Sequence, residues 1–142
     1  MENRAIAWIH CEIWMSWYKF IENRARLDAF FGDVDPPVDV DMHEIQLRRD
    51  GPELRLRFDI AIVPSILPAK WPVNTSHTQL VLSLYGIQGM TLQGFATTVC
   101  GPLLMKCTSA STELSFKGTV CTLIASGKGR LFIHTITGYG IA

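Results

Sequence analysis

The residues closest to acid–base chemistry in this 142-residue chain are the neighbours His43 and Glu44. A histidine beside a carboxylate can move protons when the two are positioned together. The pair lacks the second histidine, four residues on, that a zinc-protease helix requires. It also follows Val38, Val40 and Met42, whose period of two predicts a strand that changes parity at His43-Glu44, as at a β-bulge. We therefore expect a solvent-facing strand end here, with no catalytic residue, no metal site and no cofactor.

The cysteines offer a second kind of chemistry. No C-x-x-C pair is present and no histidine lies at ligand spacing, which disfavours a zinc knuckle. Adjacent residues on a helix point apart, so His10, Cys11 and Glu12 do not form a catalytic group. Without an export signal a disulfide framework is not expected either. We predict four reduced, mostly buried thiols at Cys11, Cys100, Cys107 and Cys121.

An acidic stretch stands out between Arg26 and Arg48, because no lysine or arginine interrupts it. Asp33-Val34-Asp35 is followed by two prolines and lacks the glycine and terminal glutamate of a calcium-binding EF-hand loop. The stretch is either a solvated strand edge or an electronegative surface for a basic partner. We expect five acidic residues of this stretch to contact the partner: Asp33, Asp35, Asp39, Asp41 and Glu44. Trp71 is expected to serve as an apolar anchor of the same contact.

Composition narrows the class of protein. Thirteen basic and 13 acidic residues give a net charge of zero, which excludes a strongly basic nucleic-acid binder, and 48% hydrophobic residues exclude disorder. The charges are uneven: residues 1–70 hold 12 of the acids, and residues 71–142 hold one acid and four bases. No apolar run is long enough for a membrane span. We expect one domain over residues 1–142, in the cytoplasm.

The first 32 residues carry the helical signal that must position these groups. Apolar residues recur at three- and four-residue steps from Trp17 to Phe31, with Ser16 as an N-cap and Gly32 at the helix end. Residues 8–15 fit either a further helical turn or an extended lead-in. We predict a helical N-terminal segment over residues 1–32.

The chain from residue 38 onward alternates as strands do. Leu54, Leu56 and Phe58 face one way and the charged residues between them face the other, which indicates an antiparallel sheet with one buried face. A proline-rich connector covers residues 64–72, and tight turns are expected at 49–52, 86–89 and 126–129. The predicted fold is α+β, mostly β: an N-terminal helix followed by an antiparallel sheet or sandwich of about eight short strands over residues 38–138.

The hairpin and connector carry a resemblance to a known family. His43 to Pro52 leads into Leu54-Arg55-Leu56-Arg57-Phe58-Asp59, and Leu67-Pro68-Ala69-Lys70-Trp71 follows. This pattern resembles the immunity protein 50 family of bacterial polymorphic toxin systems. The resemblance extends from Phe30 to Phe95, loosely includes the last ten residues, and supplies no catalytic residue. Its motif residues are His43, Arg49, Asp50, Gly51, Phe58, Asp59, Lys70 and Trp71.

The resemblance implies a non-enzymatic antitoxin of interbacterial competition. Such a protein binds and neutralises a co-encoded toxin by stoichiometric protein–protein interaction, with no nucleic-acid or membrane partner. The alternative is a small-ligand-binding β-sandwich module without catalysis, and an enzyme centred on His43 and Glu44 ranks last. A homodimer is also possible, because unpaired sheet edges of two copies could pair with each other.

Overall fold

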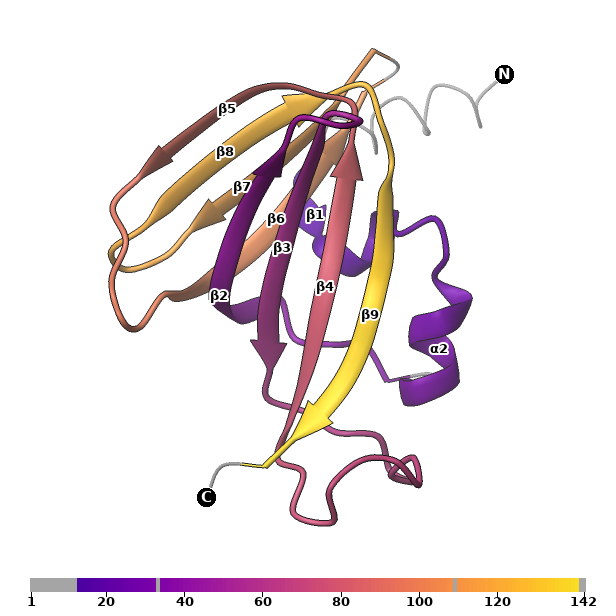
Figure 1. Cartoon of the computed structure of the whole chain (residues 1–142). Helices are drawn as coiled ribbons and strands as arrows, with labels where there is room; N and C mark the ends of the chain where they lie inside the picture. Colours follow the sequence, from indigo (N-terminus) through magenta and orange to yellow (C-terminus); the bar gives the residue numbers. More distant parts are fainter. Residues whose placement is uncertain (1–12, 33, 109, 141–142) are drawn as a thin grey trace.

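The computed structural model describes residues 13–32, 34–108 and 110–140, and most of them lie in strands. The strands form one antiparallel sheet in the order β5-β8-β7-β6-β2-β3-β4-β9, with the short β1 paired to β6 (Figure 1). The predicted mostly-β fold is therefore confirmed. The strands are β1 (Met15–Ser16), β2 (Asp39–Arg48), β3 (Glu53–Ile60), β4 (His77–Tyr85), β5 (Ile87–Gln93), β6 (Cys100–Cys107), β7 (Thr112–Lys117), β8 (Thr122–Gly127) and β9 (Leu131–Tyr139).

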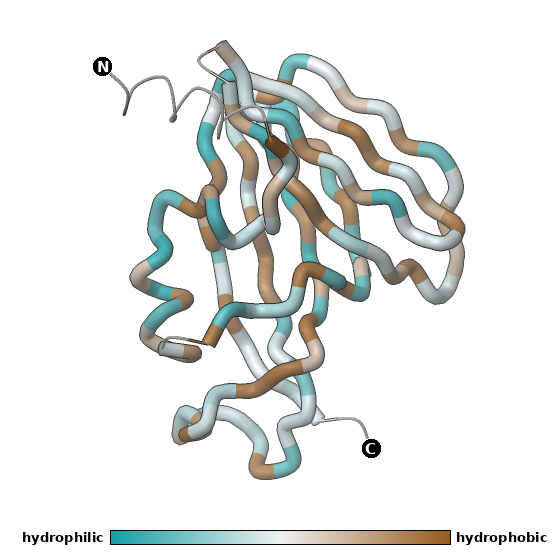
Figure 2. The backbone as a smooth tube through the Cα atoms, turned by 180° about the vertical axis from the view of Figure 1, so that it is seen from behind, coloured by the Kyte–Doolittle hydropathy of each residue, from teal (hydrophilic) through white to brown (hydrophobic). Residues whose placement is uncertain are grey.

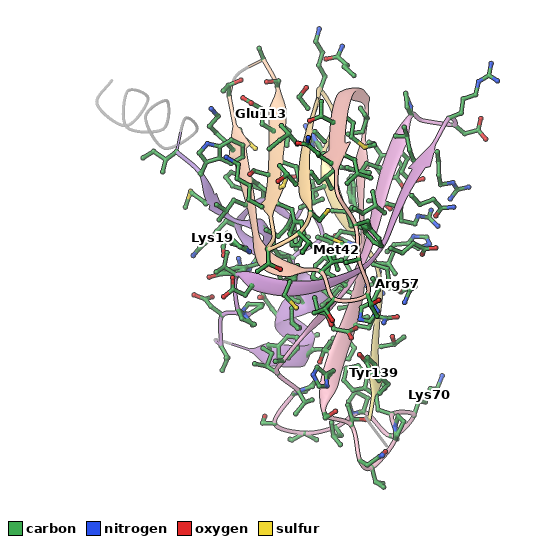
Figure 3. The ribbon with its side chains drawn as sticks, turned by 90° about the vertical axis from the view of Figure 1, so that its left-hand side faces the viewer. Lys19, Met42, Arg57, Lys70, Glu113 and Tyr139 are labelled. Carbon is green, nitrogen blue, oxygen red and sulfur yellow. The ribbon has the colours of Figure 1, made fainter. Side chains whose placement is uncertain are left out.

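The sheet consists of two arrays that meet along a short seam. The first array is β2, β3, β4 and β9, and the second is β5, β8, β7 and β6. Only Asp39–Asp41 of β2 pair with β6, opposite Cys100–Pro102. Seen from the side, the β2–β3 hairpin and the strands of the second array diverge, and Met42 lies between them while Arg57 points outward (Figure 3). The space between the arrays is therefore the core.

Apolar residues from both arrays fill that core. Phe58 of β3 and Phe116 of β7 have no exposed surface, and neither does Trp17. The Trp17 ring meets Phe58 edge-on with centroids 5.2 Å apart, and its Nε1–H donates to the Pro37 carbonyl at 3.1 Å. An aromatic ring of this size with its polar atom satisfied stabilises both its own segment and β3.

The predicted continuous helix from Trp17 to Phe31 is wrong. The structure has a 3-10 turn, η1 (Trp17–Phe20), and a separate α-helix, α2 (Ala25–Phe31). Ile21 between them is extended and forms a parallel bridge with Leu131, because its side chain enters the core beside β9. Ser16 makes no side-chain cap, and its neighbour Met15 pairs in β1.

The predicted end of the helix at Gly32 is confirmed. Gly32 has a φ of 61° and its N–H donates to the Asp28 carbonyl at 2.7 Å. A positive φ is easily adopted by glycine, which has no Cβ to clash with the backbone.

The N-terminal segment also covers the outer edge of β9, and α2 lies beside that strand (Figure 1). The Asn23 side chain acts as a short strand: Nδ2 donates to the Ile133 carbonyl at 2.9 Å, and Oδ1 accepts from the Ile133 N–H at 2.8 Å. Arg26 Nη1 donates to the carbonyls of Ile133 and His134. These contacts occupy the outer edge of β9 at residues 131–134, where they prevent pairing with another strand.

Two expected turns are crossings between the arrays. The turns at 86–89 and 126–129 are not hairpins, since β4 pairs with β3 and β9 while β5 pairs with β8. The crossings meet at one corner, where the Lys128 N–H donates to the Gly86 carbonyl at 3.1 Å. A Cβ on Gly129 would lie 1.7 Å from the Tyr85 carbonyl oxygen. Gly129 is therefore required here by the close approach of two backbone segments.

The connector between β3 and β4, residues 61–76, extends beyond the ends of the strands and mixes hydrophobic with hydrophilic residues (Figures 1 and 2). No strand forms within it, as its prolines predict.

Candidate functional site

His43 is placed by the predicted bulge in β2. Met42 pairs with Phe58 and Glu44 pairs with Arg57, so His43 is an extra residue opposite the junction of two β3 residues. Its partner is not Glu44, which instead accepts a hydrogen bond from Arg57 at 3.3 Å. His43 Nε2 lies 2.7 Å from Asp59 Oδ2.

Asp59 is the centre of a polar group that joins four strands. Its side chain is buried, and the phenol of Tyr139 on β9 donates to the same oxygen that faces His43. Gln79 of β4 donates from Nε2 to Asp59 Oδ1 at 3.0 Å. Asp41, directly opposite Asp59 in the ladder, completes the set with an oxygen 3.6 Å from His43 Nε2. We call Asp41, His43, Asp59, Gln79 and Tyr139 the Asp59 cluster.

The Asp59 cluster has the residue types of a metal or acid–base site. The ligand atoms of Asp41, His43 and Asp59 lie within 4.8 Å of one another, and these three are the sole such group among the described residues. Both oxygens of Asp59, however, already face donors from other strands. A cation would compete with those hydrogen bonds. The arrangement therefore fits a structural link between strands better than it fits a metal centre.

The acidic stretch does not form one uninterrupted surface. Asp35 lies 3.5 Å from Arg24, next to α2, whereas Asp41 contacts His43 and Glu44 contacts Arg57 on β2. Asp39, at the start of β2, is exposed and has no ion pair among the described residues. Asp33 lies outside the described residues.

Trp71 is partly buried and packs against the core. Its ring stacks on Phe30 of α2 with centroids 5.2 Å apart. It also contacts Gly138 of β9, where an added Cβ would lie 2.2 Å from the indole. Trp71 is partly exposed and the neighbouring Lys70 is exposed. Two motifs of the resemblance, Lys70-Trp71 and the Gly138-Tyr139 ending, thus meet in space.

Three arginines of the first hairpin, Arg48, Arg55 and Arg57, are paired with glutamates. Glu53 is buried although it belongs to the face expected to meet water, and Arg48 and Arg55 both contact it. Burial raises the pKa of Glu53, but hydrogen bonds from Ser83 and Arg55 and the nearby arginine charges outweigh it, so the pKa lies below its ordinary value. This carboxylate is a structural ion in the outer face of the first array.

The hairpin turn presents its motif residues to solvent. Arg49 and Asp50 are exposed, and no ion pair joins Arg49 within the described part of the chain. Gly51 has a φ of 131°, a backbone conformation that other residues rarely adopt.

The cysteines are less buried than expected. Cys121 is buried, but Cys107 is partly exposed and Cys100 is exposed, while Cys11 lies outside the described residues. None of the three described cysteines forms a disulfide. Partial burial and the carboxylates of Asp41 and Asp39 raise the pKa of the Cys100 thiol, which therefore stays protonated at neutral pH.

One hollow that a small ligand could enter is open and mainly polar. A cavity of about 550 Å³ lies between η1, the β6–β7 turn and the β8–β9 crossing. Its lining includes the cations Lys19, Lys128 and Arg130, of which Arg130 is paired with Glu22 at 2.7 Å. Nothing in it resembles the enclosed apolar pocket of a typical small-molecule site.

Sequence reasoning missed Asp59 as a centre, together with Gln79 and Tyr139. The predicted bulge and turn of the hairpin are enough to place Asp41 opposite Asp59, so that part of the cluster had a readable signal. Gln79 and Tyr139 had none, because their approach depends on the pairing of β4 with both β3 and β9.

Comparisons with known proteins complete these observations. No curated protein and no solved structure matches the chain. Among the described residues, no helix has the length and apolar character needed to cross a membrane. The family model described as immunity protein 50 matches residues 23–137, from the turn before α2 into the last residues of β9. The chain belongs to the immunity protein 50 family.

Proposed function

We propose that this immunity protein binds a co-encoded toxin domain in the cytoplasm with one-to-one stoichiometry and blocks it without catalysing a reaction. The family match over residues 23–137 carries the proposal. The polar groups support it, since no buried side-chain nitrogen or oxygen among the described residues lacks a hydrogen-bond partner. Such satisfaction suits a rigid binding scaffold, whereas a catalytic site usually keeps reactive groups turned toward substrate.

The test is a titration of the toxin domain encoded beside this gene. We expect toxin activity to fall linearly with added immunity protein and to reach zero at one equivalent, with a one-to-one complex in calorimetry. Complete inactivation by a tenth of an equivalent would instead indicate turnover, and the absence of any complex would remove the proposal.

The acidic stretch is the proposed electrostatic part of the contact. Its members are Asp33, Asp35, Asp39, Asp41 and Glu44, and the partly exposed Trp71 is the proposed anchor. Asp41 also holds His43, so reversing its charge would disturb the Asp59 cluster as well as the surface. Asp35 and Asp39 are exposed and better suited to a test.

We expect the double variant Asp35→Lys/Asp39→Lys to bind the toxin domain about three- to tenfold more weakly, an effect of about 0.6–1.4 kcal/mol. The loss should shrink as salt is added, because exposed charges are screened. The matched control is Glu22→Lys/Glu113→Lys, which makes the same charge change and also breaks surface ion pairs. Equal affinities for the two double variants would contradict the assignment.

A further inference from the structure

The second half of β2 has an edge without a strand partner. On one side β2 pairs with β3 from Asp41 to Arg48, with His43 as the bulge residue, but on the other only Asp39–Asp41 pair with β6. The Met42 N–H donates to the Val99 carbonyl at 2.7 Å, and the described structure gives no backbone partner beyond it on that side. The backbone groups of residues 43–48 that point away from β3 are therefore free to pair.

A second unpaired edge runs beside the first. β5 is the last strand of the order and pairs only with β8. Residues of β2 and β5 line the same two hollows: Leu47–Arg49 with Ile87–Met90 around about 480 Å³, and His43–Ile45 with Leu92 and Phe95 around about 300 Å³. The two edges thus face each other along a slot, which we define as residues 43–49 and 87–95.

The slot is closed at both ends. At one end the Pro52 carbonyl accepts from the Gly86 N–H at 2.8 Å, and at the other Val99 holds Met42. Between these ends the two strands run in opposite directions, because His43 lies toward Phe95 and Arg49 lies toward Ile87.

Side chains that face the core are exposed in the slot. Leu47 lies opposite the buried Leu54, and Leu92 lies opposite the buried Leu123, so both belong to the inner face. Leu47 is nevertheless 55% exposed and Leu92 45%, and Phe95 beside them is 54% exposed. The apolar layer is incomplete between β2 and β5.

The slot contrasts with the opposite border of the sheet. There the Asn23 amide and the backbone at Ile21 and Glu22 occupy the outer edge of β9. No described segment of this chain covers β2 and β5 in the same way. A second copy is poorly suited to the task, because its own free edges lie inside an identical slot and belong to paired strands.

We propose that the slot between β2 and β5 receives an extended segment of the toxin, which adds backbone hydrogen bonds to both edges and places apolar side chains against Leu47, Leu92 and Phe95. This inference rests on the proposed toxin-binding function and names the surface that performs it. The occupant must be extended, because only a strand presents N–H and C=O groups at the spacing of the two edges. Its inward side chains must be apolar, because the groups that they meet are apolar.

Hydrogen exchange on the wild-type complex with the toxin domain encoded beside this gene is the direct test. We expect amides within residues 43–48 and 87–93 to exchange at least about tenfold more slowly in the complex, because new backbone hydrogen bonds protect them. If the complex forms and these amides are unchanged, the slot assignment is wrong while toxin binding stands. If no complex forms, the proposed function itself fails. The same protection in the immunity protein alone at high concentration, with a dimer in sedimentation, would assign the slot to a second copy instead.

Substitutions give an independent test. Leu47→Arg and Leu92→Ser should each weaken toxin binding by at least about tenfold, since buried apolar anchors dominate interfaces. Ile66→Arg and Val73→Ser are matched controls on the connector, where the side chains are 85% and 97% exposed. Circular dichroism would establish that each variant is folded. Folded slot variants that bind like the connector controls would overturn the proposal.

Discussion

At the scale of single residues, two carboxylates of the first array depart from the alternating pattern of their strand. Alternation predicts that their face of β3 is exposed to solvent, but both side chains are buried. Asp59 and Glu53 are each 3% exposed, and both lie on the face of β3 opposite the core. Asp59 is surrounded by His43, Gln79 and Tyr139 from other strands of the array. Glu53 is surrounded by Ser83 and Arg48 from neighbouring strands and by Arg55 of its own strand. Polar ties of this kind fix strand register, because a shifted partner would leave a buried group unsatisfied.

Asp59→Asn should destabilise the protein by about 1–3 kcal/mol, because the amide would turn a donor or a weaker acceptor toward His43 and Tyr139. Urea unfolding followed by fluorescence measures the change. Asp39→Asn is the control, an identical substitution at an exposed position of the adjacent strand, and should change stability by less than about 0.5 kcal/mol. Similar losses in both variants would show that Asp59 is no tie.

Glu53 gives a pH dependence with a definite sign. Its pKa in the folded protein is lower than the ordinary value of 4.5, so the ionised group stabilises the fold above that pH, and the stabilisation is lost as pH falls through the lower folded-state pKa. Unfolding free energy should therefore begin to decline below about pH 4.5. Glu53→Gln should flatten this decline, whereas Glu44→Gln, on an exposed ion pair, should leave its slope nearly unchanged. An unaltered slope for Glu53→Gln would contradict the assignment.

At the scale of elements, the segment between Trp17 and Phe31 shows how tertiary contacts override helical periodicity. The apolar spacing is present, and Leu27 and Phe31 are buried as it predicts. The backbone at Ile21 is nevertheless taken by β9, and this pairing interrupts the helix. The same interruption brings the Asn23 side chain to the Ile133 backbone. The segment from Trp17 to Phe31 is therefore not one helix, and part of it covers the edge of β9.

Asn23→Ala should lower stability by about 1–3 kcal/mol, since two hydrogen bonds to Ile133 are lost and its backbone groups lose their partners. It should also increase self-association, because the uncovered β9 edge can pair with another chain. Thermal unfolding and sedimentation velocity measure the two effects. Asn74→Ala, an exposed asparagine of the connector, is the control. A monomeric Asn23→Ala protein of unchanged stability would show that the edge needs no cover.

At the scale of the whole molecule, the local pattern of apolar and polar residues predicted the strands. It did not predict the order of the strands in the sheet. Alternation placed all of β2 to β9, and the parity change at His43 located the bulge, because both are properties of neighbouring residues. The seam of β2 with β6 and the pairing of β4 with β9 join residues far apart in the chain, which alternation does not encode. In the candidate site, the part formed by the β2–β3 hairpin could be predicted from the sequence, because its residues are neighbours along the chain. The contributions of Gln79 and Tyr139 could not be predicted, because they depend on the pairing of β4 with β3 and β9.

The two closed ends of the slot restrict the shape of any chain that enters it. Because hydrogen bonds at Pro52 and at Val99 join the borders, a segment lying between β2 and β5 has no open end through which to continue along its own axis. It must come in and go out through the same face of the sheet, with a bend on either side. A suitable toxin segment is therefore a short extended stretch of a surface loop. A long continuous strand would not fit, because it would extend past the closed ends of the slot.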